Sequence, residues 1–456
     1  MRFAAVALLV AIMLVAVAGR DSAPARAITG PMGVIQTYMG TGVPGNTGDA
    51  GAPAAATITG PNGIAVAPNG DLYVSSGCVV RRVHASVVTT VADVCALSSP
   101  SPILSGVAIS PSGDVDFGMD CVVMKVTTGA PVVAAGDPLC GGQPCGCTGT
   151  FVQVGGIAFD RTGNLFVADW HHCVVKKVDT GGIITTVVGT GSGAPFSCSN
   201  TGDGGLATAA TLDYPLGVTV ADNGDLYVAT GEGNGIARIR KVSHGIISTF
   251  AGGPCCALGD GGPATSASVQ LSSYLVSGMV VDQTGDLYLA DAGNCRVRRV
   301  SRGVITTIAG NGSCAAAGDG GQATNASMHP VDVALDSDGT LYIADGYDGS
   351  PITPNNLVRT VFGVALDSDQ DGYTDQQETA IGKDPMIYCP IMRADVDGDG
   401  TVTILDLAKV AGFFGQMVPP APPRYRQGPP PFGSAINILD LSKMAMQYYK
   451  TVSACP

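Results

Sequence analysis

The sequence predicts a mainly β fold, a six-bladed β-propeller, on three observations: a sixfold repeat, a turn signal inside each repeat, and a composition poor in charge. The 456 residues include 64 glycines, whereas charged residues make up 13% and aromatic residues 5%. Many glycines suit a fold with many tight turns. A helical bundle needs charged outer faces and a disordered chain lacks apolar residues, so both are disfavoured.

The repeat is a strand–turn–strand unit that occurs six times. Two short apolar runs are joined through a glycine-containing turn, as in "GVTVADNGDLYV" and "GIAFDRTGNLFV". Two further strands follow most units, for example in "CRVRRVSRGVITTIAG" at 295–310. Four short antiparallel strands per repeat predict six blades. The units begin at Gly63, Gly106, Gly156, Gly217, Gly278 and Asp332.

The two ends of the repeat region predict how the ring closes. The last unit has a third strand at 355–361, but no fourth strand follows it. The matching strand stands at the other end, because "GVIQTYMGTG" at 33–42 is similar to "GVITTIAGNG" at 303–312. We therefore expect the N-terminal strand to complete the last blade, which would remove both open sheet edges. The predicted propeller spans residues 28–363.

Three motifs resemble the NHL-repeat propellers of secreted bacterial proteins. They are the loop "GDGGPATSASV" at 259–269, the turn D-x-x-G-D-L-Y, and "NCRVRRV" at 294–300. The resemblance covers roughly residues 30–363. The second and third repeats lack the loop, and its further copies stand at 202–212, 318–328 and, in a weaker form, 48–58.

The first 27 residues predict export. Arg2 is followed by a short apolar core, and a small-x-small triplet ends at Ala27, which together are typical of a signal peptide over 1–27. A membrane anchor is the alternative, but the apolar run is shorter than the ~20 residues that a spanning helix needs. Removing this segment deletes three Arg and one Asp and takes the formal charge from −13 to −15. Nucleic acid is therefore a poor candidate partner.

Fourteen cysteines in an exported chain predict disulfides. In four repeats one cysteine precedes the third strand and another follows the fourth, and antiparallel strands bring these points to the same end of a blade. The predicted pairs are Cys78–Cys95, Cys121–Cys140, Cys173–Cys198 and Cys295–Cys314. Cys389 and Cys455 bracket the C-terminal segment and are expected to pair. Free buried thiols are the alternative, and Cys145, Cys147, Cys255 and Cys256 remain unassigned.

Two acidic segments near the C-terminus match a twelve-residue calcium loop. They are "DSDQDGYTDQQE" at 367–378 and "DVDGDGTVTILD" at 395–406, in which alternate oxygen-bearing residues converge on one ion. A solvated acidic turn is the alternative. The sequence predicts two Ca²⁺ sites, with ligands Asp367, Asp369, Asp371, Tyr373 (carbonyl), Asp375 and Glu378 in the first, and Asp395, Asp397, Asp399, Thr401, Thr403 and Asp406 in the second.

The C-terminal segments also resemble known modules. "TAIGKDP" after the first loop resembles thrombospondin type 3 calcium repeats, so 364–388 is predicted as a calcium linker. Residues 389–456 resemble a small α-helical dockerin type I module, with matching helices at 404–415 and 438–449. Its second loop departs from the family because prolines occupy ligand positions. The resemblance implies docking to a cohesin-like partner through Ile404, Leu405, Ile438 and Leu439. The alternative is that these residues pack inside the module or against the propeller.

Signs of catalysis are sparse. Enzymes on this architecture use Glu, Asn, Asp or His at a central metal, and Glu232, His171 and His172 are the candidates here. The register puts His172 where Asn294 stands in another repeat, which favours an orienting role. Aspartates that recur in register suggest structural hydrogen bonds. We therefore expect a non-catalytic recognition protein, with a secreted hydrolase or lyase acting on polysaccharide or lactone, and a structural envelope or matrix protein, as alternatives.

Overall fold

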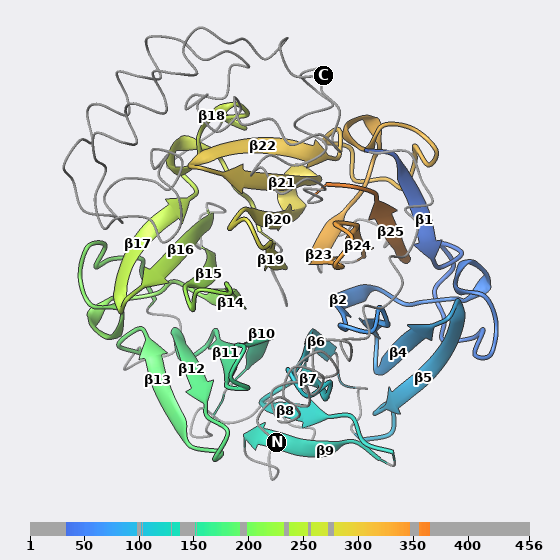
Figure 1. Cartoon of the computed structure of the whole chain (residues 1–456), viewed down its shortest axis with the longest axis horizontal. Helices are drawn as coiled ribbons and strands as arrows, with labels where there is room; N and C mark the ends of the chain where they lie inside the picture. The colour runs from blue at the N-terminus through green and yellow to red at the C-terminus, as the bar shows by residue number, and fades with distance from the viewer. Residues whose placement is uncertain are drawn as a thin grey trace, which may run out of the picture. The chain divides into compact units, whose positions relative to one another are not determined.

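The computed structural model describes most of the repeat region as a ring of six antiparallel sheets (Figure 1). This confirms the predicted mainly β, six-bladed propeller. The predicted signal peptide, both calcium loops and the dockerin-like module lie outside the described residues. The described residues are 33–97, 102, 104–128, 130–136, 151, 153–191, 198–231, 237–253, 257–271, 278–346 and 355–364.

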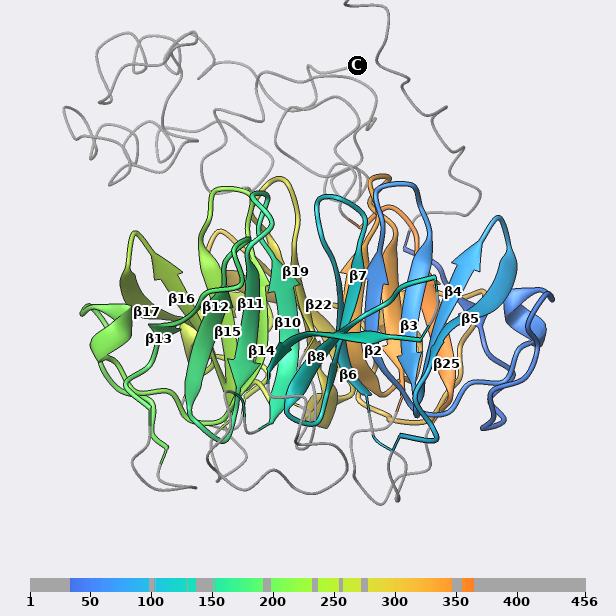
Figure 2. The ribbon, with the colours of Figure 1, turned by 90° about the horizontal axis from the view of Figure 1, so that it is seen from below.

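Each blade is a four-stranded meander whose first strand is innermost, and the strands run roughly along the ring axis (Figure 2). Blade 1 contains β2 (Pro61–Val66), β3 (Leu72–Ser76), β4 (Val79–His84) and β5 (Val87–Asp93). Blade 2 contains β6 (Leu104–Ile109), β7 (Val115–Met119), β8 (Val122–Lys125) and β9 (Val132–Gly136). Blade 3 contains β10 (Val154–Phe159), β11 (Leu165–Asp169), β12 (Val174–Val178) and β13 (Ile184–Val188).

The remaining blades follow the same order. Blade 4 contains β14 (Pro215–Val220), β15 (Leu226–Gly231), β16 (Ala237–Ser243) and β17 (Ile246–Ala251). Blade 5 contains β19 (Met279–Val281), β20 (Leu287–Asp291), β21 (Arg296–Ser301) and β22 (Val304–Ala309), with the short β18 (Gly262–Pro263) added at its outer edge. Blade 6 contains β23 (Pro330–Leu335), β24 (Leu341–Asp345), β25 (Leu357–Val361) and β1 (Ile35–Met39).

The N-terminal strand closes the ring as predicted. β1 pairs antiparallel with β25, and the register runs from Ile35 opposite Val361 to Met39 opposite Val358. The loop that precedes blade 6 also pairs with β1, because Ile35 N–H donates to the Gly321 carbonyl at 3.1 Å. The outer strand of the last blade is therefore covered on its free edge by the loop that connects blade 5 to blade 6.

The core lies between blades, because each sheet buries both faces against its neighbours. Six clusters of buried apolar side chains occupy the six junctions. Ile343 on blade 6, for example, packs in one cluster with Tyr288 and Val297 on blade 5. Burying one such aliphatic side chain contributes about 1.5–3 kcal/mol. This arrangement explains why second strands such as β20 are buried along their whole length, whereas outer strands alternate between buried and exposed residues.

No helix within the part of the chain that the structure describes is long and apolar enough to cross a membrane.

Candidate functional site

A buried arginine on the third strand anchors the GDGG loop in blade 5. The Arg298 guanidinium is fully buried, and its Nη2 donates to the Asp260 carboxylate of the loop at 2.9 Å. The other carboxylate oxygen of Asp260 accepts from the Thr307 hydroxyl on β22 at 2.8 Å. One aspartate thus joins the loop to the third and fourth strands of its blade. Arginine suits this position because its guanidinium presents five donors in a rigid fork.

The same triad occurs in each of the four repeats that carry a copy of the loop. Sequence reasoning expected these aspartates to have structural roles, and their hydrogen bonds agree with that. It did not predict the arginine partners. The members are Asp49–Arg81–Thr90, Asp203–Arg240–Thr249, Asp260–Arg298–Thr307 and Asp319–Arg359–Thr37.

The two repeats without the loop also lack the arginine. The register places Met124 on β8 and Lys176 on β12 where Arg298 stands on β21. The loop and the arginine are therefore present together or absent together in each repeat. This co-occurrence is the signal in the sequence from which the aspartate–arginine pairing can be predicted. In the closing blade, burial acts to raise the pKa of Asp319, but hydrogen bonds from Thr37 and Arg359 outweigh it and lower that pKa below its ordinary value.

A second recurrent aspartate ends the second strand of three blades and is completely buried. In blade 5, Asp291 accepts from Asn294 Nδ2 at 2.9 Å and from Arg298 Nη1 at 3.0 Å. In blade 3, Asp169 instead contacts His172 Nδ1 at 2.7 Å and Lys176 Nζ at 3.1 Å. His172 therefore takes the place of Asn294 as a partner of the buried aspartate.

Three of the four predicted propeller disulfides are present among the described residues. Cys78–Cys95, Cys173–Cys198 and Cys295–Cys314 each join the turn before a third strand to the segment after the fourth, with Cα–Cα distances of 5.0, 6.0 and 5.1 Å. Cys121 is also disulfide-bonded, and its expected partner Cys140 lies outside the described residues. Disulfides persist mainly in oxidising compartments, so these bonds fit an extracellular protein.

An aromatic cluster lies beside the Cys173–Cys198 disulfide. Trp170, the single tryptophan of the chain, has its ring centroid 4.2 Å from that of His171 and 5.9 Å from that of Tyr214. The three side chains belong to half-buried residues, so the cluster is fixed by packing yet remains accessible. Burial lowers the pKa of His171, which favours its neutral form near pH 7.

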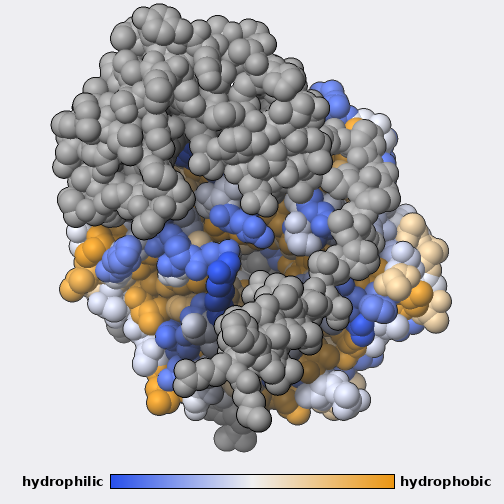
Figure 3. Space-filling view, in the orientation of Figure 1, coloured by the Kyte–Doolittle hydropathy of each residue, from blue (hydrophilic) through white to orange (hydrophobic). Residues whose placement is uncertain are grey.

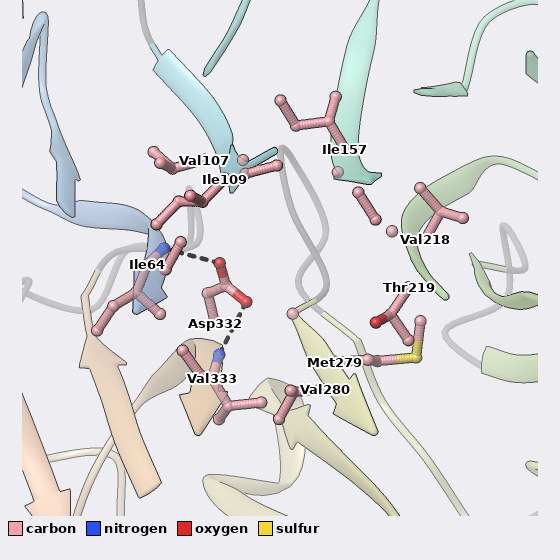
Figure 4. A pocket seen from close by; sticks show the side chains of 18 of the residues that line it. Ile64, Val107, Ile109, Ile157, Val218, Thr219, Met279, Val280, Asp332 and Val333 are labelled. Carbon is pink, nitrogen blue, oxygen red and sulfur yellow. Dashed lines mark hydrogen bonds between the residues drawn. The ribbon is translucent and has the colours of Figure 1, made fainter. Parts of the chain in front are cut away.

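The centre of the ring contains a cavity of about 240 Å³ lined by the first-strand segments of all six blades (Figure 4). Asp332 reaches this cavity from blade 6. Its Oδ2 accepts from the Ile64 N–H of blade 1 at 2.9 Å, and its Oδ1 accepts from the Val333 N–H at 2.8 Å. Burial raises the pKa of Asp332 to about 7. Sequence reasoning recorded this residue only as the start of the sixth unit.

A second buried carboxyl departs from the repeat in blade 2. Asp116 on β7 stands where other blades have tyrosine or phenylalanine, and it is 5% exposed. One of its oxygens is without a hydrogen-bond partner among the described residues. Burial raises its pKa to about 6.

The described surface mixes hydrophilic and hydrophobic residues, and hydrophobic ones reach the outer rim of the ring (Figure 3). Within the described residues, no group of three or more His, Cys, Asp or Glu side chains is arranged to hold a metal ion. The predicted calcium ligands at 367–378 and 395–406, the predicted docking residues Ile404, Leu405, Ile438 and Leu439, the cysteines Cys389 and Cys455, and Glu232 all lie outside the described residues.

Comparisons with known proteins give sequence relatives that match part of the chain and solved structures that share the fold. No family model matches. The chain is 26% identical over 268 residues to Teneurin-1 of Mus musculus, covering 56% of this chain and 8% of that protein. It is 31% identical over 214 residues to Teneurin-1 of Homo sapiens, covering 42% of this chain and 7% of that protein. The chain therefore spans less than a tenth of the length of these relatives.

Two solved structures from Bacteroides thetaiotaomicron share the fold. A structural genomics protein of unknown function superposes with a TM-score of 0.50 at 19% identity, covering 72% of this chain and 75% of that chain. A putative phosphatase superposes with a TM-score of 0.51 at 13% identity, covering 73% of this chain and 78% of that chain. Identities this low show the fold alone.

Proposed function

We propose that this chain is a secreted, calcium-binding recognition protein without a catalytic role. In this proposal the propeller binds a carbohydrate or protein ligand at the surface around Trp170. The C-terminal dockerin-like module tethers the propeller to a cohesin-like protein or to another envelope or matrix protein. Calcium bound at 367–378 and 395–406 would order the tether, because these loops supply the six or more oxygens that Ca²⁺ needs.

The observation that carries the proposal is the contrast between the aromatic cluster and the recurrent carboxylates. The aspartates of the GDGG loops and second strands are engaged with Arg, Thr, Asn or His in the same register from blade to blade, as structural groups are. The cluster of Trp170, His171 and Tyr214 occurs once, is partly accessible and lies next to a disulfide. Rigid aromatic side chains of this kind supply contact area at low entropic cost.

Ligand binding is tested through intrinsic fluorescence, since Trp170 is the single tryptophan. Candidate polysaccharide fragments from the source organism's envelope are titrated into the full-length protein, and a saturable change in emission is expected. Trp170→Ala should abolish binding of the same ligand in calorimetry. Lys125→Ala, at a half-exposed ion pair in another blade, serves as the control and should bind normally. Equal affinity of Trp170→Ala and wild type would contradict this part of the proposal.

The tether is tested by capture from the secretome on immobilised protein, with Ca²⁺ or with EDTA. Calcium-dependent capture that is lost in Asp397→Ala supports it, and capture that is equal in EDTA contradicts it.

Turnover assays on lactones and polysaccharides with alanine at Glu232, His171 and His172 address the enzymatic alternative. If the wild-type protein turns over a substrate and these variants do not, the enzymatic alternative is supported and the recognition proposal is rejected. Size-exclusion chromatography with and without calcium addresses the structural alternative, which a monomeric profile in both conditions would reject.

A further inference from the structure

Polar main-chain groups face the cavity at the centre of the ring, although most of the side chains that line it are apolar. Each first strand lies at the inner end of its sheet and is bonded to a strand on one side only. Its other edge therefore presents N–H and C=O groups toward the channel. A cavity of about 240 Å³ is large enough for several water molecules or a partly hydrated ion beside these groups.

One blade departs from glycine at a repeated position in this lining. The other five units have Gly63, Gly106, Gly156, Gly217 and Gly278 where blade 6 has Asp332. Close approach of adjacent blades explains the glycines, because a Cβ on Gly63 would lie 2.7 Å from the Ser105 carbonyl oxygen. At the junction of blades 6 and 1 there is room for a carboxyl group instead, and it bridges the two first strands through the Ile64 N–H (Figure 4).

No charged side chain among the described residues compensates the Asp332 carboxylate. Asp332 is 7% exposed and is the single ionisable residue among those that line the cavity. No salt bridge to Asp332 exists among the described residues, and its hydrogen bonds come from the main-chain N–H groups of Ile64 and Val333. Each carboxylate oxygen keeps a further lone pair. Above its pKa the Asp332 carboxylate is a buried charge without a countercharge, and a cation bound beside it would stabilise that charged form.

The donor set specifies what that species is. A carboxylate, main-chain carbonyls and water are hard oxygen ligands, which suit alkali and alkaline-earth cations. A divalent ion would leave a buried net positive charge next to a single carboxylate, whereas a monovalent ion is neutralised. We propose that the central channel binds a monovalent cation of the Na⁺ or K⁺ class, held by Asp332 and main-chain carbonyl oxygens, at the junction where the ring closes.

Thermal unfolding of the full-length protein tests this site. The protein is unfolded at pH 8.5 in EDTA, in NaCl, KCl or tetramethylammonium chloride at equal ionic strength. Tetramethylammonium is too large to be coordinated, so the midpoint should be higher in NaCl or KCl, by about 2 °C or more. The difference between the sodium and potassium arms identifies the preferred ion. Broadening of the ²³Na NMR line by the wild-type protein gives a second, direct readout.

Two variants and one control make the outcome decisive. Asp332→Gly restores the residue of the other five blades and Asp332→Asn keeps the shape, and both should lose the cation dependence and the line broadening. Asp116→Asn removes a different buried carboxyl outside the cavity lining and should keep both. The proposal is overturned if wild type shows no difference between the salts, or if the difference persists in both Asp332 variants.

Discussion

The Asp319 carboxylate accepts a 2.6 Å hydrogen bond from the Arg359 guanidinium, although the two residues are 40 positions apart in the chain. The same carboxylate accepts from the Thr37 hydroxyl at 2.6 Å, so one aspartate links the last strand of the repeat region to the first strand of the ring. In the other three triads, threonine and arginine belong to consecutive strands. At the closure they come from opposite ends of the propeller.

Asp319→Asn is therefore expected to loosen the closure as well as lower the stability. Replacing a charged acceptor of a buried arginine should reduce the free energy of unfolding by about 2 kcal/mol. Asp203→Asn breaks the equivalent triad inside blade 4 and is the matched control. Limited proteolysis should cut near β1 earlier in Asp319→Asn than in Asp203→Asn. Identical cleavage patterns would show that the closure has no special dependence on Asp319.

Arg298→Met tests the network from its buried side. Methionine occupies this register in blade 2 as Met124, so it is compatible with a third strand. In blade 5 the change would leave the completely buried Asp291 without its cationic partner. The expected loss is about 3–5 kcal/mol by chemical denaturation. Arg82→Met, at a partly exposed position on β4, should cost less. A smaller loss for Arg298→Met than for Arg82→Met would contradict the assigned role.

Much of this architecture is predictable from the sequence because the six repeats can be compared with one another position by position. The register of the repeat predicts which cysteines pair and which strand completes blade 6, since the cysteine positions recur in four units and the strand pattern recurs around the ring. The arginines were missed because an arginine usually lies at the surface, and its loop partner is about forty residues upstream. Only the joint absence of arginine and loop in the second and third repeats reveals the pair.

Asp332 shows a different limit. In the sequence it reads as one substitution in a repeated motif, and its partner Ile64 is 268 positions away. The contact between Asp332 and Ile64 exists only because the ring closes, so no short stretch of the sequence predicts it. Its burial is likewise a property of six strands meeting at an axis. The aromatic cluster has the same origin, because Tyr214 approaches Trp170 from the following blade.

The channel geometry makes Gly278 intolerant of a side chain. A Cβ there would lie 1.7 Å from Asp332 Oδ1 and 2.3 Å from its Cα, so the main chain itself must move. Gly278→Ala should lower the free energy of unfolding by about 2–3 kcal/mol, as overpacking of a tight interior does. Gly231→Ala is the control, since its nearest contact is an ordinary 3.5 Å. Equal stability of the two variants in denaturant titrations would contradict this packing.

Asp116 should make stability depend on pH between about 4 and 6. Its folded pKa is raised to about 6, above the ordinary value, so the folded state binds the proton more tightly than the unfolded state does. The stabilisation is present at low pH and is lost as pH rises through 6, by about 3 kcal/mol at most. Asp116→Asn lacks this titration, so the difference in free energy of unfolding between wild type and variant should change with pH over this range. A pH-independent difference would contradict the assignment.

The propeller disulfides should contribute similar amounts, because they close loops of similar length. Cys78–Cys95 and Cys295–Cys314 have sequence separations of 17 and 19. Replacing both cysteines of either pair by serine should cost about 3 kcal/mol in denaturant titrations. A change near zero for either pair would show that its bond does not constrain the unfolded chain.

The proposed function depends most directly on calcium binding. Equilibrium dialysis of the full-length protein against radioactive Ca²⁺ measures the number of ions bound per chain. We predict two ions per chain, one of which is lost in Asp369→Ala and the other in Asp397→Ala. Asp319→Asn, in a propeller loop that is also acidic, should still bind two. A wild-type protein that binds no calcium at millimolar concentration would contradict the proposed function.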